Sequence, residues 1–289
     1  MRRAWLVGLT LLGCCVLPGR ASADAWTQAA GDCYLKLAAR GIFGSGAYQS
    51  TGLRDDRQGI VDYQDVQANL YGECGVHPQL TVLSFMTPFG YANASTSTGY
   101  VGPYGIGLRL DPIGDGAPTR FAIQASYSYA PPAGDVILFE EPRASPRVFY
   151  RPALENHVGE LDVQLGHGFV IDDNVSGWVV GSVGARIQSG EGMDAALVAM
   201  AQVGMTFYGW LTAELHVPLY EPFGQPVVET NIAGVGQTRY LGFGFTVSFW
   251  MIPELSLVLG LDGVFYASSN AATPSLMLGF QSRWGPDDL

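Results

Sequence analysis

The sequence has little charge and almost no lysine. Charged residues make up 14% of its 289 residues, against roughly 25% in an average soluble domain. Lys36 is the only lysine, while 48% of the residues are apolar. So few charges would leave the surface of a water-soluble protein poorly solvated, and the composition therefore favours a protein that contacts lipid.

After its first residues, the chain also lacks a hydrophobic run long enough for a membrane helix, which needs roughly 20 residues. The most apolar late stretch, residues 251–267, contains Pro253, Glu254 and Asp262. A membrane helix there would bury charge at a considerable cost. A β-barrel avoids this conflict because its backbone groups pair between strands and only alternate side chains must be apolar.

The first 23 residues have the order of an export signal. Two arginines precede an apolar stretch over residues 4–17, and the triplet Ala-Ser-Ala follows at 21–23. That order is typical of a cleaved secretory signal. We therefore expect residues 1–23 to be removed and residues 24–289 to form one outer-membrane β-barrel. A lipoprotein cleavage box at residues 11–14, Leu-Leu-Gly-Cys, is the alternative.

Removal of this signal makes the chain more acidic. The signal contains three arginines and no acid, so 15 − 3 = 12 basic residues remain against 26 acidic ones, a net charge of −14. Binding to nucleic acid needs a basic surface. We therefore expect no nucleic-acid partner.

Alternation of apolar and polar residues with a period of two predicts the strands. In the stretch 254–267, for example, Leu257, Leu259 and Leu261 share one face, and Ser256 and Asp262 share the other. We expect an all-β fold, a single transmembrane antiparallel up-and-down β-barrel of about 12 strands, within about 10–14. The expected spans are 33–43, 62–76, 79–92, 99–111, 119–131, 158–170, 175–188, 195–208, 210–220, 238–250, 254–267 and 273–284.

The connections between these spans support the same architecture. Tight turns near residues 77–78, 172–174, 209 and 251–253 alternate with connections that include long loops at 44–61, 132–157 and 221–237. Outer-membrane barrels have short periplasmic turns and long external loops. This asymmetry predicts an even number of strands, with the N-terminus and the C-terminus of the barrel both on the side of the short turns. Aromatic residues near the strand ends predict interface girdles: Tyr127, Tyr129, Phe207, Tyr208, Trp210, Phe249, Trp250, Phe265, Tyr266 and Trp284.

The stretch Asp65 to Leu83 resembles an outer-membrane family named for the meta-pathway of phenol degradation. The matching residues are Tyr71, Glu73, Gly75, Leu80, Thr81 and Val82, with similar runs at 25–27, 34–37 and 132–135. Cys74 and the run 105–109 depart from the family pattern. The resemblance implies a small outer-membrane barrel and a transport role.

No motif for a cofactor, a metal ion or catalysis is present. The four histidines, His77, His157, His167 and His216, do not form a His-Glu-x-x-His motif, and no Cys-x-x-Cys occurs. The run around His167 is similar to that of an outer-membrane phospholipase, but the next serine is Ser176, so a nucleophile constellation is missing. We therefore expect no cofactor, and a lipid-modifying enzyme is the least favoured function.

Charged residues of both signs fall on the faces expected to line the lumen. These candidates are Lys36, Arg40, Asp65, Glu73, Arg109, Arg120, Glu160, Asp162, Arg186, Glu214, His216, Asp262 and Arg283. In one interpretation they pair across the interior and plug a narrow barrel. In the other they line a water-filled path whose charges select solutes.

The mature chain would keep two cysteines, Cys33 and Cys74. They lie at the same end of neighbouring antiparallel strands, on the face that carries Leu35 and Leu70, and the compartment oxidises thiols. We therefore predict a disulfide between them.

Two functions remain open. The first is a passive channel or transporter for small molecules, hydrophobic ones included, whose solute the sequence does not identify. The second is a structural or adhesion barrel with a closed lumen that acts through its extracellular loops. In both cases the expected partners are outer-membrane lipid and lipopolysaccharide, and the expected location is the bacterial outer membrane.

Overall fold

The computed structural model describes residues 27–44, 46–48, 52, 54–55, 62–113, 118–134, 136–137, 148–190, 193, 195–224, 230–231, 233–235 and 238–285. The expected signal peptide, residues 1–23, lies outside these residues. Glu140 and Glu141, in the long loop expected at 132–157, lie outside them as well.

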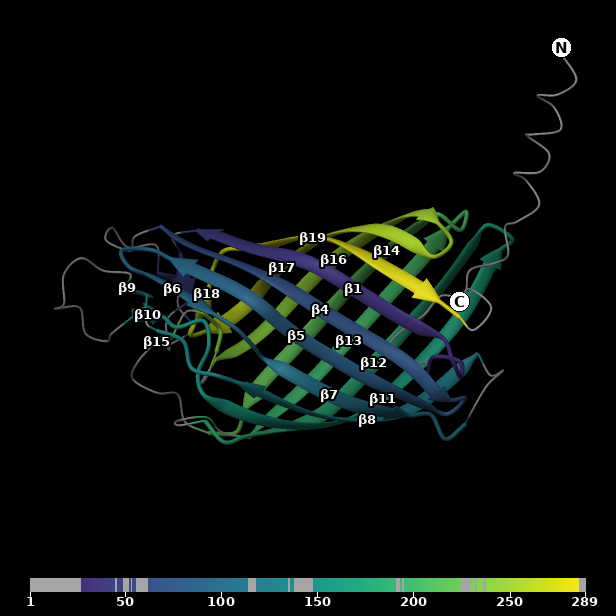
Figure 1. Ribbon diagram of the computed structural model, residues 1–289, viewed down its shortest axis with the longest axis horizontal. Helices are drawn as coiled ribbons and strands as arrows, with labels where there is room; N and C mark the ends of the chain where they lie inside the picture. The colour runs from purple at the N-terminus through teal and green to yellow at the C-terminus, as the bar shows by residue number, and fades with distance from the viewer. Residues whose placement is uncertain are drawn as a thin grey trace, which may run out of the picture.

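Twelve long antiparallel strands form the wall of a closed barrel (Figure 1). Each strand pairs with the wall strands that precede and follow it in the chain, and the last pairs with the first, which closes the cylinder. The all-β, up-and-down barrel predicted from the sequence is therefore confirmed. The wall strands are β1 (Cys33–Gly44), β4 (Tyr63–His77), β5 (Leu80–Asn93), β7 (Tyr104–Leu110), β8 (Thr119–Ala130), β11 (Asn156–Asp172), β12 (Val175–Gln188), β13 (Ala196–Phe207), β14 (Leu211–Pro222), β16 (Arg239–Ile252), β17 (Leu255–Ser268) and β19 (Ser275–Trp284).

One expected strand differs from the prediction. The span 99–111 is divided between β6 (Ser97–Tyr100) and β7, and both segments pair with β5. The break falls at Gly102, whose φ is +83°, and at Pro103, which has no N–H group to donate to a ladder. Thr87 of β5 bridges the break, because it accepts from the Gly102 amide and donates to the Pro103 carbonyl.

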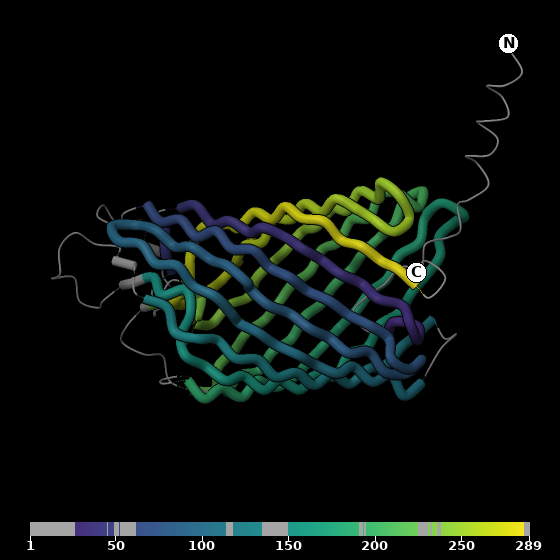
Figure 2. The backbone as a smooth tube through the Cα atoms, in the orientation of Figure 1, coloured from purple at the N-terminus to yellow at the C-terminus, as the bar shows by residue number. Residues whose placement is uncertain are grey.

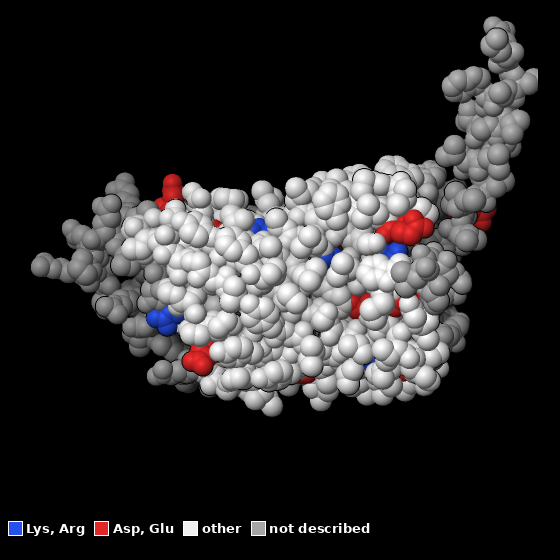
Figure 3. All heavy atoms as spheres, viewed as in Figure 1, with Lys and Arg blue, Asp and Glu red and all other residues white. Residues whose placement is uncertain are grey.

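Apolar side chains cover the outside of the wall, and polar ones face inward. Ile106, Leu165 and Leu278 are each more than half exposed, whereas Thr81 and Ser256 on the inner faces are fully buried. A soluble protein has the opposite distribution, and a barrel in hydrocarbon has this one. Most atoms on the face drawn in Figure 3 belong to uncharged residues. Among the described residues, no helix has the length and apolar character needed to cross a membrane.

Exposed aromatic residues gather toward both ends of the wall. Phe89, Tyr127 and Phe265 lie toward the loop end, and Tyr208 and Trp210 lie in a turn at the other end. This arrangement suits side chains at the two membrane interfaces. The expectation for Trp250 was wrong. Its ring lies inside the barrel, where its Nε1 donates to Thr212, because its position in β16 has the inward parity of Ser248.

The two ends of the barrel differ. At one end, where β1 begins beside the end of β19, tight turns join the strands; one turn places Tyr208 and Gly209 at positive φ, which glycine adopts without strain. At the opposite end, at the left in Figures 1 and 2, the loops pair with one another. We call these loop segments the loop cap. Its two small sheets consist of β2 (Ala47–Tyr48), β3 (Arg54–Asp55) and β18 (Asn270–Ala271), and of β9 (Val136–Ile137), β10 (Val148–Tyr150) and β15 (Thr230–Asn231).

Candidate functional site

The structure places all the charged and histidine candidates on the inward side of their strands. Strand parity shows this clearly: Glu160 and Asp162 flank Leu161, whose side chain is exposed on the outer wall. The same relation holds for Lys36 between Leu35 and Leu37. The interior of the barrel is therefore the candidate functional site.

The described residues enclose two cavities inside the barrel, and Tyr71 lines both of them. The cavity toward the turn end has a volume of about 390 Å³ and is lined by residues of β1, β4, β13, β14, β16 and β19. The cavity toward the loop cap has a volume of about 360 Å³. Pro152 and Val235 of the loop cap line this second cavity. Each cavity is large enough for several water molecules or a small organic solute.

Ion pairs near the turn end fix part of the inner wall. Arg109 contacts both carboxylate oxygens of Glu73, at 3.2 and 3.3 Å, and donates from Nε to Gln124. Arg120 donates to Asp111 at 2.9 Å, and the Asp111 side chain is fully buried. These pairs support the interpretation in which inward charges neutralise one another, since an unpaired buried charge is costly.

A second cluster lies beside the cap-side cavity. Arg186 of β12 contacts Glu160 of β11 at 2.7 Å, and its guanidinium lies 5.3 Å from the centre of the Tyr220 ring. Tyr220 stacks on Tyr240 with ring centres 5.7 Å apart. Rings, a carboxylate and a guanidinium therefore share one wall of this cavity.

A chain of polar contacts runs along the inner surface of the wall from β14 to β1. His216 Nε2 lies 3.2 Å from Asp262 Oδ1, and Ser275 Oγ lies 3.5 Å from Asp262 Oδ2. Arg40 donates from Nε to Ser275 at 2.9 Å. His216 fits because Gly244 opposite has no side chain; a Cβ there would lie 2.0 Å from its Nε2.

Three further candidates, Asp162, Glu214 and Arg283, have partners of other kinds. Asp162 accepts from Gln164 at 2.7 Å, and Glu214 accepts from Gln202 at 3.4 Å. The guanidinium of Arg283 lies 4.5 Å from the centre of the Trp250 ring, a cation–π contact.

The loop cap is anchored to the barrel through Asp65. The Asp65 carboxylate accepts from Tyr100 at 2.7 Å and from Tyr150 of β10. The Tyr150 ring is buried and lies 5.6 Å from the ring of Tyr63. Burial, together with the nearby Asp65 carboxylate, raises the pKa of Tyr150 well above its ordinary value. The hydroxyl therefore stays neutral and able to donate, and the loop of β10 is held over the lumen.

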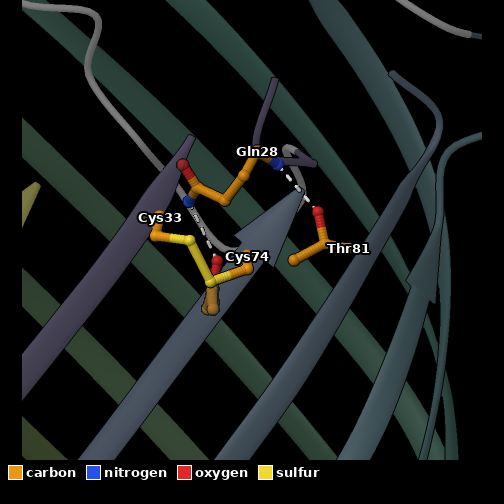
Figure 4. Close-up of a disulfide and its surroundings, with 5 residues drawn as sticks. Gln28, Cys33, Cys74 and Thr81 are labelled. Carbon is orange, nitrogen blue, oxygen red and sulfur yellow. Dashed lines mark hydrogen bonds between the residues drawn. A yellow bond between two sulfur atoms is a disulfide. The ribbon is translucent and has the colours of Figure 1, made fainter. Parts of the chain in front are cut away.

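The segment before β1 folds against the inner wall at the turn end. Gln28 donates its backbone N–H to Thr81 Oγ1 at 2.8 Å (Figure 4). Its side-chain Nε2 donates to Glu73 at 2.9 Å. Gly31 and Asp32 each form a backbone hydrogen bond with Gly75. We call Thr27–Asp32 the N-terminal segment; it narrows the opening at this end.

The predicted disulfide is present beside this segment. Cys33 and Cys74 are directly opposed in the register of β1 and β4, and their Cα atoms are 4.2 Å apart (Figure 4). The bridge therefore fixes the point at which the N-terminal segment leaves the wall.

Several residues of the site were not selected from the sequence. Asp111 lies at the end of an expected strand. It is two residues from Arg109, and this spacing could have shown that its side chain also faces inward. Tyr100 and Tyr150 carry no period-two signal, because they lie in segments of four and three residues. Within the described residues, no group of three or more His, Cys, Asp or Glu side chains could hold a metal ion.

Comparison with known proteins shows similarity in fold. The crystal structure of the COG4313 outer membrane channel from Pseudomonas putida F1 superposes with a TM-score of 0.61 at 13% sequence identity, over 91% of this chain and 99% of that one. The NanC porin covers 86% of this chain and 98% of its own at 8% identity (TM-score 0.47). The β domain of the Bordetella autotransporter BrkA covers 89% and 100% at 10% identity (TM-score 0.49). No family model and no curated sequence matches the chain. The chain therefore has the fold of an outer-membrane barrel.

Proposed function

We propose that this protein is an outer-membrane channel or transporter for small molecules. The observation that carries the proposal is the pair of cavities inside a closed barrel whose outer wall is apolar. A wall of this kind needs hydrocarbon around it, while cavities inside the barrel whose lining includes charged and polar side chains provide a path for solutes. The similarity of the Asp65–Leu83 hairpin to the family named for the meta-pathway of phenol degradation agrees with a transport role.

The composition of the cap-side cavity supports solutes that combine polar and apolar parts. Phe85, Tyr220 and Tyr240 offer ring surfaces, whereas Gln124 and Gln188 offer hydrogen-bonding amides. Binding sites for small molecules commonly combine apolar walls with a few polar groups.

One observation favours the alternative, a barrel that works through its loops. The contacts of Tyr100 and Tyr150 with Asp65 hold the loop cap over the lumen. The N-terminal segment narrows the other end. If both closures are permanent, the lumen conducts nothing and only the outer surface is available for function.

Conductance in planar lipid bilayers separates these two functions. A channel gives discrete current steps, and Tyr150→Ala should increase their size because the loop cap loses a buried ring. Tyr91→Ala is the matched control, since that ring lies exposed on the outer wall. A wild-type barrel and a Tyr150→Ala variant that both conduct no ions would contradict the proposal and favour the alternative.

A further inference from the structure

Lys36, the only lysine in the sequence, faces the turn-side cavity. Lys36 lines this cavity, and within the described residues its ammonium group forms no hydrogen bond or ion pair. Most inward arginines differ from it, because Arg109, Arg120 and Arg186 each contact a carboxylate. An ammonium group in a protein interior is stabilised by a partner of opposite charge or by water.

Glu73 and Glu214 also line this cavity, and these carboxylates and that of Asp262 already have partners. Glu73 is held by Arg109 and Gln28. Glu214 accepts from Gln202, and Asp262 contacts His216. Among the described residues, no carboxylate lies within ion-pair distance of Lys36, and Asp262 interacts with it only over a longer distance.

Two amide side chains of this cavity have N–H groups without an acceptor among the described residues. Gln281 lies directly opposite Lys36 in the register of β1 and β19, and its Oε1 accepts from the Tyr34 hydroxyl at 2.8 Å. Asn69 of β4 uses its Oδ1 to accept from Thr87 at 2.9 Å. In the described part of the chain, the Nε2 group of Gln281 and the Nδ2 group of Asn69 have no acceptor. Both residues line the same cavity as Lys36.

An ammonium group and two amide N–H groups that face one space form a surface complementary to an anion. A carboxylate has two oxygens that accept several hydrogen bonds, and a charged hydrogen bond of this kind is stronger than a neutral one. Met277 and Met200 line the same cavity, and their flexible thioethers adapt to a short apolar chain.

We propose that the turn-side cavity is a binding site for a small aliphatic carboxylate, with the carboxylate on Lys36, Gln281 and Asn69 and the alkyl part against Met277 and Met200. This inference rests on the proposed channel function for the access of the ligand to the lumen. Binding should be weak, in the millimolar range, because a solute in transit must also leave.

The single lysine allows a direct test. The amines of the unfolded chain, which are Lys36 and the N-terminus, are dimethylated with ¹³C-formaldehyde and cyanoborohydride as the reductant, and the chain is then refolded in detergent. Butyrate is the probe, and the Lys36 signal should move in a saturable way while the N-terminal signal reports non-specific effects. Butyramide, the neutral analogue of similar size, should cause no such shift. The proposal is wrong if butyrate does not shift the Lys36 signal, or if butyramide shifts it equally.

An isosteric variant provides a second, independent test. Gln281→Glu places a carboxylate directly opposite Lys36, so the ammonium group gains an internal partner and the site loses a donor. Butyrate affinity should then fall by about tenfold or more, as expected when a charged hydrogen bond is lost. Unchanged affinity in Gln281→Glu contradicts the assignment.

The outcomes separate this site from the channel function. If the protein conducts but the Lys36 signal does not shift with butyrate, the channel function stands and the carboxylate site is rejected. A saturable shift without conductance supports the site and rejects the channel. In the conducting protein, butyrate should block current in wild type and in Lys36→Arg, which keeps the charge. It should not block current in Lys36→Gln, and equal block in all three proteins would again reject the site.

Discussion

Gly75 of β4 lies directly against the backbone of Ala29 in the N-terminal segment. A Cβ atom at residue 75 would lie 2.1 Å from the carbonyl oxygen of Ala29, closer than any real contact. The backbone itself forms this obstacle, so no side-chain rotation can relieve it. The absence of a side chain at Gly75 therefore allows the N-terminal segment to pack against the inner wall.

We predict that Gly75→Ala displaces the N-terminal segment while the barrel remains folded. The amide of Gly31, which donates to the Gly75 carbonyl at 2.8 Å, should lose its protection in hydrogen-exchange measurements. Gly181→Ala is the matched control, because a Cβ there meets no atom within 4 Å. Full protection of Gly31 in Gly75→Ala would show that the segment tolerates a side chain at this position.

The strand spans and the inward parity were predictable from the sequence because they depend on local alternation. Leu257 and Ser256 had to lie on opposite faces once residues 254–267 formed a strand. The loop cap was not predictable. Its strands are two or three residues long and pair segments far apart in the chain, such as β10 with β15, so no periodic signal could mark Tyr150 as the partner of Asp65.

The second prediction tests the face assignment of β17. Leu259 is exposed on the outer wall, and Asp262 faces the lumen beside His216. Leu259→Arg should lower the free energy of unfolding by roughly 2–4 kcal/mol, because a charge near the bilayer midplane is costly. Asp262→Asn should cost much less. Guanidinium unfolding of the refolded barrel in liposomes measures both changes, and equal losses would show that the assignment of this strand is wrong.

The third prediction concerns the pair of Arg120 and Asp111. Both side chains are almost completely buried, so Arg120→Met removes the ion pair from the Asp111 carboxylate inside the protein. We expect a loss of about 3–5 kcal/mol in the free energy of unfolding. The double variant Arg120→Met with Asp111→Leu should lose less than the sum of the single variants. Additive losses in this double-mutant cycle would mean that the two residues do not stabilise each other.

The fourth prediction concerns location. A closed barrel with an apolar outer wall should be recovered in the outer-membrane fraction, where lipid covers residues such as Leu165 and Leu278. The unheated protein should migrate differently from the heated protein on a detergent gel, because the barrel resists detergent until heated. Recovery as a soluble periplasmic protein would contradict the membrane interpretation.

The last prediction concerns the bridge between Cys33 and Cys74. The cysteines are 41 residues apart in sequence and directly opposed in the barrel wall. Closing a loop of this length restricts the unfolded chain and should stabilise the barrel by up to about 4 kcal/mol in the chain-entropy model. The variant Cys33→Ala with Cys74→Ala should therefore unfold at lower guanidinium concentration than the oxidised wild type. Reduction of the wild type should give a similar loss, because it removes the same constraint without changing the sequence. Thiol labelling of the denatured, unreduced mature protein should find no free thiol at these positions; two labelled thiols per chain would show that the bridge does not form in the cell.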